Sequence, residues 1–212
     1  HDPRVQNSIP LSGFDNFMPT YQFLKTLCAS IDDFKIDNEH LMIISPDEGA
    51  MQRAVYFSNI LGVDMGMFYK RRDYSTVING RNPIVAHEFL GDSVEGKDVI
   101  VIDDMISSGE SMLDGQKVKG QEGKAGHCLH YLGLFTDGLE KFDDYFEKEY
   151  IYRVITTNLN YRNPDLLNRP YYLEADMSKY LASIMDILNH DLSVEKVRST
   201  TKKINKLLNR FS

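Results

Sequence analysis

A continuous apolar run of β-branched residues, Val99–Ile102, is followed directly by two acids, Asp103 and Asp104. An apolar run without alternation is typical of a strand buried on both faces, and such strands occur in parallel sheets covered by helices. We therefore predict a strand over 99–102, a loop over 103–111 and a helix from about Met112. A loop that follows a parallel strand lies at the sheet edge where α/β proteins bind ligands.

Apolar segments elsewhere alternate between strand and helix patterns. Strands are predicted over 41–44, 63–69, 84–89, 131–135, 153–156 and 171–173, and helices over 50–61, 139–148 and 177–190. The polar and basic stretch 70–82 is predicted to be a loop. Strands that alternate with helices imply right-handed βαβ units. The predicted fold class is therefore α/β, a mostly parallel twisted sheet flanked by helices.

The C-terminal tail has one apolar stripe on an otherwise basic segment. Its apolar positions are three or four residues apart and comprise Val194, Val197, Thr201, Ile204, Leu208 and Phe211. We predict one α/β domain over 1–190 and an amphipathic helix over 191–212. A helix that packs on its own domain is favoured over one that binds a partner.

Composition restricts the class of protein further. The chain has 212 residues, of which 42% are hydrophobic and 26% charged, which excludes disordered, collagen-like and coiled-coil chains. No apolar run approaches the roughly 18 residues of a membrane span. A net charge of −7 argues against a nucleic-acid partner but permits an anionic ligand in a local site. Two cysteines form no disulfide framework, so a reducing, cytoplasmic location is expected.

The turn after the two acids has the composition of a phosphate site. It comprises Ser107, Ser108, Gly109, Glu110 and Ser111. Amides at a helix N-terminus bind phosphate, and glycine lets the backbone approach closely. Asp103 and Asp104 could accept hydrogen bonds from vicinal sugar hydroxyls or hold Mg²⁺. The alternative is a capped helix start beside two solvated acids. The segment matches neither a Walker loop nor a dinucleotide fingerprint.

The segment 103–111 resembles the phosphoribosyl diphosphate (PRPP) loop of type I phosphoribosyltransferase folds. The resemblance implies that Asp103 and Asp104 hold the ribose 2′ and 3′ hydroxyls. It also implies that Ser107 to Ser111 bind the 5′-phosphate. Residues 1–190 would then adopt the type I phosphoribosyltransferase fold.

Two other segments narrow the resemblance to ribose-phosphate diphosphokinases, the PRPP synthetases. The stretch 45–54, Ser-Pro-Asp-Glu-Gly-Ala-Met-Gln-Arg-Ala, is similar to their Ser-Pro-Asp-x-Gly-x-x-x-Arg-Ala segment. The stretch 69–72, Tyr-Lys-Arg-Arg, is similar to the opening of their flexible catalytic loop. The resemblance implies that Lys70 and Arg72 are catalytic. Without it, Asp47 is equally well a helix cap, and the two cations belong to a solvated loop.

The resemblance also implies substrates, a metal and an assembly. ATP would give its diphosphate to the C1 hydroxyl of ribose 5-phosphate, with Mg²⁺ held by His1 and Asp47, in a homo-oligomer. The chain begins where the second of two similar α/β domains of the synthetases should begin, so we expect little or no activity from it alone. The alternatives are a PRPP-consuming phosphoribosyltransferase and a non-catalytic regulatory relative. His87, His127 and His130 lack metal-ligand spacing and are predicted to be structural.

Overall fold

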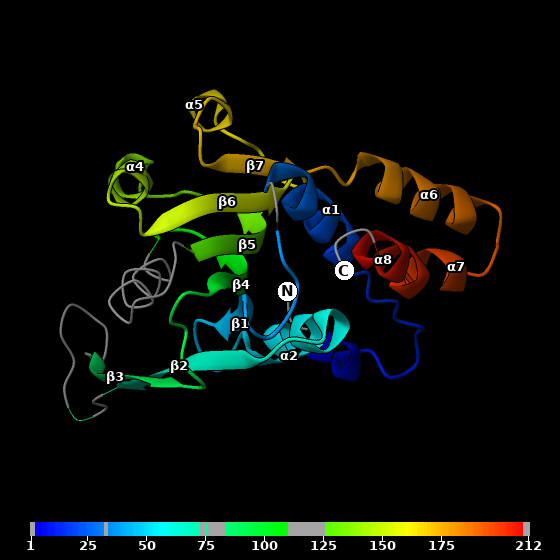
Figure 1. Cartoon of the computed structure of the whole chain (residues 1–212). Coiled ribbons are helices and arrows are strands. Elements are labelled where there is room, and N and C mark those ends of the chain that lie inside the picture. The colour runs from blue at the N-terminus through cyan, green and yellow to red at the C-terminus, as the bar shows by residue number, and fades with distance from the viewer. Residues whose placement is uncertain (1–2, 32–33, 73–74, 76–83, 110–125, 210–212) are drawn as a thin grey trace.

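The protein folds around one seven-stranded sheet with the strand order β3-β2-β1-β4-β5-β6-β7 (Figure 1). The computed structural model describes residues 3–31, 34–72, 75, 84–109 and 126–209. The strands are β1 (Leu41–Ser45), β2 (Met65–Arg72), β3 (Ile84–Leu90), β4 (Asp98–Ile106), β5 (Gly126–Gly133), β6 (Ile151–Thr157) and β7 (Tyr172–Ala175). Neighbouring strands are parallel except β2 and β3, which are antiparallel. The predicted α/β class is confirmed.

Helices cover both faces of this sheet. The helices of the described chain are η1 (Pro3–Ser8), α1 (Thr20–Ser30), α2 (Met51–Leu61), α4 (Glu140–Glu147), α5 (Pro164–Leu167), α6 (Ser178–Asn189), α7 (Glu195–Arg198) and α8 (Thr201–Leu208). Ile100 and Ile102 of β4 pack with α1, α2 and α8, whereas Val99 and Val101 pack on the opposite face with α4. The apolar run therefore alternates between two cores. This explains why it shows no polar face.

Strand β4 is longer than predicted, so Asp103 and Asp104 belong to the strand and not to a loop. In the register with β5, Asp103 lies opposite His130, and Met105 opposite Leu132. Ile106 is buried, and its carbonyl accepts a hydrogen bond from the Leu134 amide at 2.8 Å. Backbone hydrogen bonds between neighbouring strands form with polar and apolar side chains alike. A pattern of side-chain polarity therefore does not show where the pairing ends. The helix predicted from Met112 lies outside the described residues.

Strand β2 also continues past its apolar residues. Lys70 pairs with His87, Arg71 with Ala86 and Arg72 with Ile84, so these three positions lie in an antiparallel ribbon and not in the predicted loop. On the other side of β4, β5 begins at Gly126, five residues before the predicted start. The early part of β5 was missed because it contains His127 and His130, which are buried despite their polarity.

The tail forms two short helices, α7 and α8, and not the single helix predicted from its stripe. Ser199 between them is extended, with φ −79° and ψ 97°. Ile204 is fully buried in the core with α1 and the sheet, whereas Thr201 is exposed. The division of the chain into 1–190 and 191–212 stays a prediction. No helix in the described part of the chain is long and apolar enough to cross a membrane.

Candidate functional site

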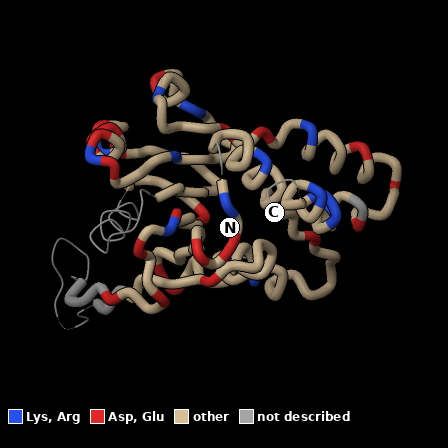
Figure 2. The backbone as a smooth tube through the Cα atoms, viewed as in Figure 1, with Lys and Arg blue, Asp and Glu red and all other residues tan. Residues whose placement is uncertain are grey.

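The carboxyl edge of the sheet brings the end of β4 next to the turn that follows β1. Strands β1 and β4 are parallel neighbours, so their carboxyl ends meet at one edge. Figure 2 shows acidic segments on the connections at this edge. The side chains that the sequence singled out after these two strands, Asp47, Asp103 and Asp104, therefore belong to one region of the molecule.

Asp104 is held by a cation from helix α2. Its Oδ2 lies 3.6 Å from Nη2 of Arg53, and only 14% and 13% of the two side chains are exposed. The Arg53 guanidinium also lies over the Tyr131 ring, 5.7 Å from the ring centroid. A partly buried ion pair that stacks on an aromatic ring fixes the direction of the carboxylate. Arg53 therefore positions Asp104.

Asp103 has an unusual ionisation equilibrium. Burial of its carboxyl, with smaller contributions from the negative charges of Asp104 and Asp47, raises its pKa to about 7. A hydrogen bond from the Asp104 amide to Asp103 Oδ1, 2.8 Å long, opposes the rise of this pKa. Desolvation and like charges both disfavour the ionised form of an acid. Asp103 therefore changes its charge near neutral pH.

The substitution Asp103→Asn should change how stability depends on pH. An acid whose pKa is raised by folding contributes stability that is fully present below its ordinary pKa of 3.8 and is lost as the pH rises through about 7. Asparagine cannot ionise, so the free energy of unfolding of the variant relative to wild type should rise by roughly 1–3 kcal/mol between about pH 4 and about pH 8. Urea unfolding in EDTA at both pH values measures this change. An equal difference at both pH values would contradict the assignment.

Asp47 lies in the turn between β1 and α2 and is half-buried. Its Oδ1 accepts a hydrogen bond from the Ala50 amide at 3.1 Å, and its carbonyl accepts one from the Ser45 hydroxyl at 2.6 Å. The N-cap residue of α2 is Ala50, with no side-chain cap hydrogen bond, so Asp47 anchors the turn before the helix and is not its cap. The other carboxylate oxygen, Oδ2, makes neither of these two contacts.

The turn after β4 packs on the start of α4. The hydroxyls of Ser107 and Thr136 are 2.7 Å apart, and the Lys141 ammonium donates to the Ser108 carbonyl at 3.3 Å. Gly109 is buried with φ +78°, and a Cβ atom there would lie 2.9 Å from Cζ of Phe142. Only glycine adopts this conformation in this space without strain. These contacts anchor the turn on Thr136 and on the start of α4.

Five predicted site residues are not described down to their side chains. His1, Glu110 and Ser111 lie outside the described residues. Lys70 and Arg72 are placed only by their backbone in β2. Among the described residues, no group of three or more histidine, cysteine or acidic side chains could hold a metal ion. The assigned roles of these five residues stay predictions.

Of the three histidines predicted to be structural, His127 and His130 are buried in β5. Burial lowers the pKa of both His127 and His130 to about 4, so both rings are neutral at neutral pH. Neither ring nitrogen of His130 has a hydrogen-bond partner in the part of the chain that the structure describes. Burial within β5 agrees with a structural role for these two residues.

A mostly parallel sheet covered by helices, with acids and a turn at its carboxyl edge, defines an α/β protein of the open-sheet class. Within that class, the sequence signature of the phosphoribosyl transferase domain matches residues 17–129, just over half of the chain. The chain belongs to the phosphoribosyl transferase domain family. The match includes Asp47, Asp103, Asp104 and the turn 107–109.

The individual relatives with similar sequences are ribose-phosphate pyrophosphokinases. The chain is 36% identical over 91 residues to a ribose-phosphate pyrophosphokinase of Wolinella succinogenes, covering 42% of this chain and 27% of the relative. It is 28% identical over 134 residues to one of Thermococcus kodakarensis, covering 59% and 45%. Each match spans less than half of the relative's length. The recognised resemblance to the PRPP synthetases is thus confirmed for part of the chain.

The fold is also found in a solved structure. The phosphoribosylpyrophosphate synthetase from Mycobacterium smegmatis superposes with a TM-score of 0.64 at 18% identity, over 81% of this chain and 51% of that one. At this identity the likeness establishes the fold alone. The type I phosphoribosyltransferase-like architecture predicted from the sequence is confirmed.

Proposed function

We propose that this chain is the part of a ribose-phosphate diphosphokinase that binds ribose 5-phosphate and takes part in transferring the diphosphate of ATP to it. The observation that carries the proposal is the arrangement at the end of β4, where Asp103 and Asp104 precede the turn Ser107–Gly109. The names of the relatives, ribose-phosphate pyrophosphokinases, support the same activity.

In this proposal the two acids bind the sugar and the turn binds the phosphate. The carboxylates of Asp103 and Asp104 accept hydrogen bonds from the 2′ and 3′ hydroxyls of ribose. Arg53 keeps Asp104 in position for this contact. The amides and hydroxyls of the turn, from Ser107 to Ser111, bind the 5′-phosphate. The C1 hydroxyl then faces out from the sheet edge towards ATP.

The proposed reaction is an in-line displacement. The C1 hydroxyl oxygen of ribose 5-phosphate forms a bond to the β-phosphorus of ATP, and the hydroxyl proton is released. The bond between the β-phosphorus and the oxygen bridging to the α-phosphate breaks, and AMP leaves with that oxygen. Lys70 and Arg72 stabilise the negative charge on the moving diphosphate, which is the main contribution a protein makes to phosphoryl transfer.

The acids at the sheet edge also fit a role in holding Mg²⁺. Carboxylate oxygens are its preferred protein ligands, and Mg²⁺ bound to a nucleotide usually takes only one or two of them together with phosphates and water. Asp47, which is close enough to Asp103 to raise its pKa, would provide one ligand and His1 another. When bound, Mg²⁺ neutralises part of the charge of the polyphosphate. We further propose a cytoplasmic homo-oligomer, as the resemblance implies.

Product analysis tests the proposal directly. ATP, Mg²⁺ and ribose 5-phosphate are supplied to the longest natural form of the protein, and AMP and PRPP are quantified. AMP and PRPP should form in equal amounts, Lys70→Ala should slow their formation at least about tenfold, and Lys35→Ala should leave the rate unchanged. Lys35 is exposed and precedes β1, at the amino edge of the sheet. PRPP consumption with a nucleobase, without AMP formation from ATP, would contradict the proposal.

A further inference from the structure

The first turn of α4 is held by two residues from a distant part of the chain. Oδ1 of Asp143 accepts a hydrogen bond of 2.9 Å from Nε of Arg169 and one of 2.8 Å from the Tyr171 hydroxyl. Oδ2 of Asp143 accepts a third, also 2.9 Å long, from Nη2 of Arg169. Two parallel bonds from one guanidinium fix both the distance and the orientation of a carboxylate. We call Asp143, Arg169 and Tyr171 the α4 clamp.

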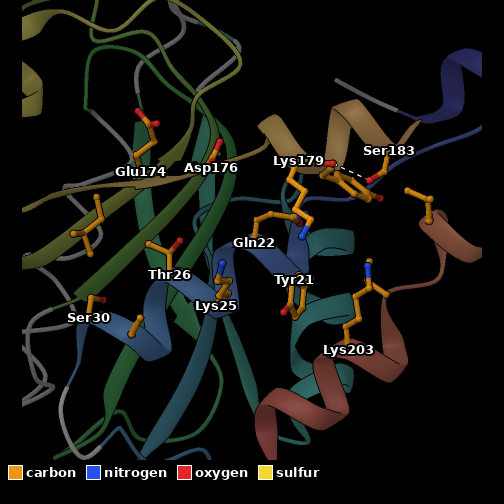
Figure 3. A pocket seen from close by; sticks show the side chains of 15 residues that line it. Tyr21, Gln22, Lys25, Thr26, Ser30, Glu174, Asp176, Lys179, Ser183 and Lys203 are labelled. Atoms are coloured by element: carbon orange, nitrogen blue, oxygen red, sulfur yellow. Dashed lines mark hydrogen bonds between the residues drawn. The ribbon is translucent and has the colours of Figure 1, made fainter. Parts of the chain in front are cut away.

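The segment that holds Asp143 is itself fixed to the sheet. Tyr171 is buried, and its carbonyl accepts a hydrogen bond of 2.8 Å from the Val154 amide of β6. Strand β7 begins at the next residue, and its Leu173 packs in the core that contains α1. Figure 3 shows α1 beside the end of this strand, where residues of both elements line one cavity. The clamp therefore ties α4 to the sheet edge formed by β6 and β7.

The buried hydroxyl of Tyr171 depends on the Asp143 carboxylate. Burial and the hydrogen bond to Asp143 raise the pKa of Tyr171, so its hydroxyl keeps its proton and acts as the donor. A buried donor that loses its acceptor costs more free energy than the bond itself contributes. Only 34% of the Asp143 side chain and 36% of the Arg169 side chain are exposed. An acid with three donors around it is held more firmly than one in a solvent-exposed ion pair.

The same turn of α4 supports the candidate phosphate turn after β4. The Lys141 ammonium donates to the Ser108 carbonyl at 3.3 Å. The ring of Phe142 lies against Gly109, since its Cζ is 2.9 Å from the position of a Cβ there. Asp143 follows these two residues of α4 directly. A helix of eight residues is too short to be stable by itself, so its position depends on tertiary contacts such as the clamp.

We propose that Asp143 is a positioning residue for the binding of the sugar 5′-phosphate. Through the clamp it fixes Lys141 and Phe142 against the turn, so that Ser108 and Gly109 keep the conformation that binds the phosphate. Asp143 itself does not touch the ligand, because its carboxylate is occupied by the three donors of the clamp. Its charge alone would repel a phosphate, so its benefit lies in the position that it gives to α4. This inference rests on the proposed binding of ribose 5-phosphate at the end of β4.

Calorimetric titration of the whole chain with ribose 5-phosphate tests this role. Asp143→Asn keeps the size of the side chain and removes a negative charge, which by electrostatics alone should strengthen the binding of an anion. We expect the opposite, a loss of affinity of at least about fivefold, because the first turn of α4 is no longer held in place. Asp144→Asn is the matched control, since Asp144 is the next residue of α4 and pairs within that helix, with Lys148 at 2.7 Å. This variant should bind at least as tightly as wild type.

A double-substitution cycle separates positioning from a general loss of stability. Arg169→Gln should weaken binding about as much as Asp143→Asn does. The double variant Asp143→Asn/Arg169→Gln should lose no more affinity than either single variant, because both residues act through one contact. Ile204→Val lies in the core with α1, on the face of the sheet opposite α4, and should lower stability without changing affinity.

Three results would overturn the role of Asp143 while the proposed function stands. They are binding by Asp143→Asn within about twofold of wild type, equal losses in Asp143→Asn and Asp144→Asn, and losses that add up in the double variant. A wild-type chain that binds no ribose 5-phosphate would instead overturn the proposed function, and this inference with it.

Discussion

The double substitution Asp103→Asn/Asp104→Asn should reduce the affinity for ribose 5-phosphate by at least about 100-fold. A hydrogen bond to a charged group contributes about 1.5–3 kcal/mol, and each carboxylate is expected to accept at least one from the sugar. Two such losses amount to at least about 3 kcal/mol, and each 1.4 kcal/mol is roughly a factor of ten. The substitution also removes the ion pair between Arg53 and Asp104.

Calorimetric titration of the chain with ribose 5-phosphate measures this effect. The titration is run at about pH 8, where Asp103 of the wild type, with a pKa of about 7, is ionised. Glu147→Gln removes one exposed negative charge at the end of α4 and serves as the control for net charge. If the double variant binds within threefold of wild type, the acids do not hold the sugar.

The second large effect is expected for Gly109→Val. Its φ of +78° is strained for any residue with a Cβ, and that Cβ would lie 2.9 Å from Cζ of Phe142 inside the packed turn. Backbone strain and overpacking together should lower the free energy of unfolding by about 2–4 kcal/mol. The turn that remains should be displaced, so ribose 5-phosphate affinity should fall at least about tenfold.

Gly96→Val provides a matched control for this variant. Gly96 has a similar φ of +67°, but nothing lies within 4 Å of a Cβ placed there. Its substitution should therefore cost only the backbone strain, about 1 kcal/mol, and leave ribose 5-phosphate affinity unchanged. Urea unfolding and calorimetry on both variants separate the two effects. Equal losses of affinity in Gly96→Val and Gly109→Val would show that the turn has no specific role.

Sequence patterns predicted the centre of the fold better than its ends. The runs of β1 and β4 are apolar because both faces of each strand are buried, and this signal is independent of distant parts of the chain. Strand ends are harder to predict. The backbone pairing of β4 continues through Asp103 and Asp104, and that of β2 continues through its basic residues, beyond the last apolar residue of each run. The start of β5 was hidden for a similar reason, since His127 and His130 are polar yet buried.

The candidate site likewise has one part that a local sequence motif predicts and another part that only the fold brings together. The acids and the turn after β4 are consecutive in the sequence, so a local motif was sufficient to find them. Thr136 and Lys141, which hold the turn in place, lie about 30 residues later and reach it only because β5 and α4 fold next to β4. Arg53 stands inside a motif, but its contact with Asp104 depends on how α2 packs on the sheet. The spacing of residues in a single sequence does not predict such tertiary contacts.

The most direct test of the account is an NMR titration of the ¹⁵N-labelled chain with ribose 5-phosphate. Saturable shifts are expected for the amides from Asp103 to Gly109, with smaller ones at Thr136 and the start of α4. Ribose without phosphate should shift them far less, because the turn binds the 5′-phosphate. Saturable shifts confined to other parts of the chain, or none at millimolar ribose 5-phosphate, would contradict the claim that the end of β4 binds a phosphorylated pentose.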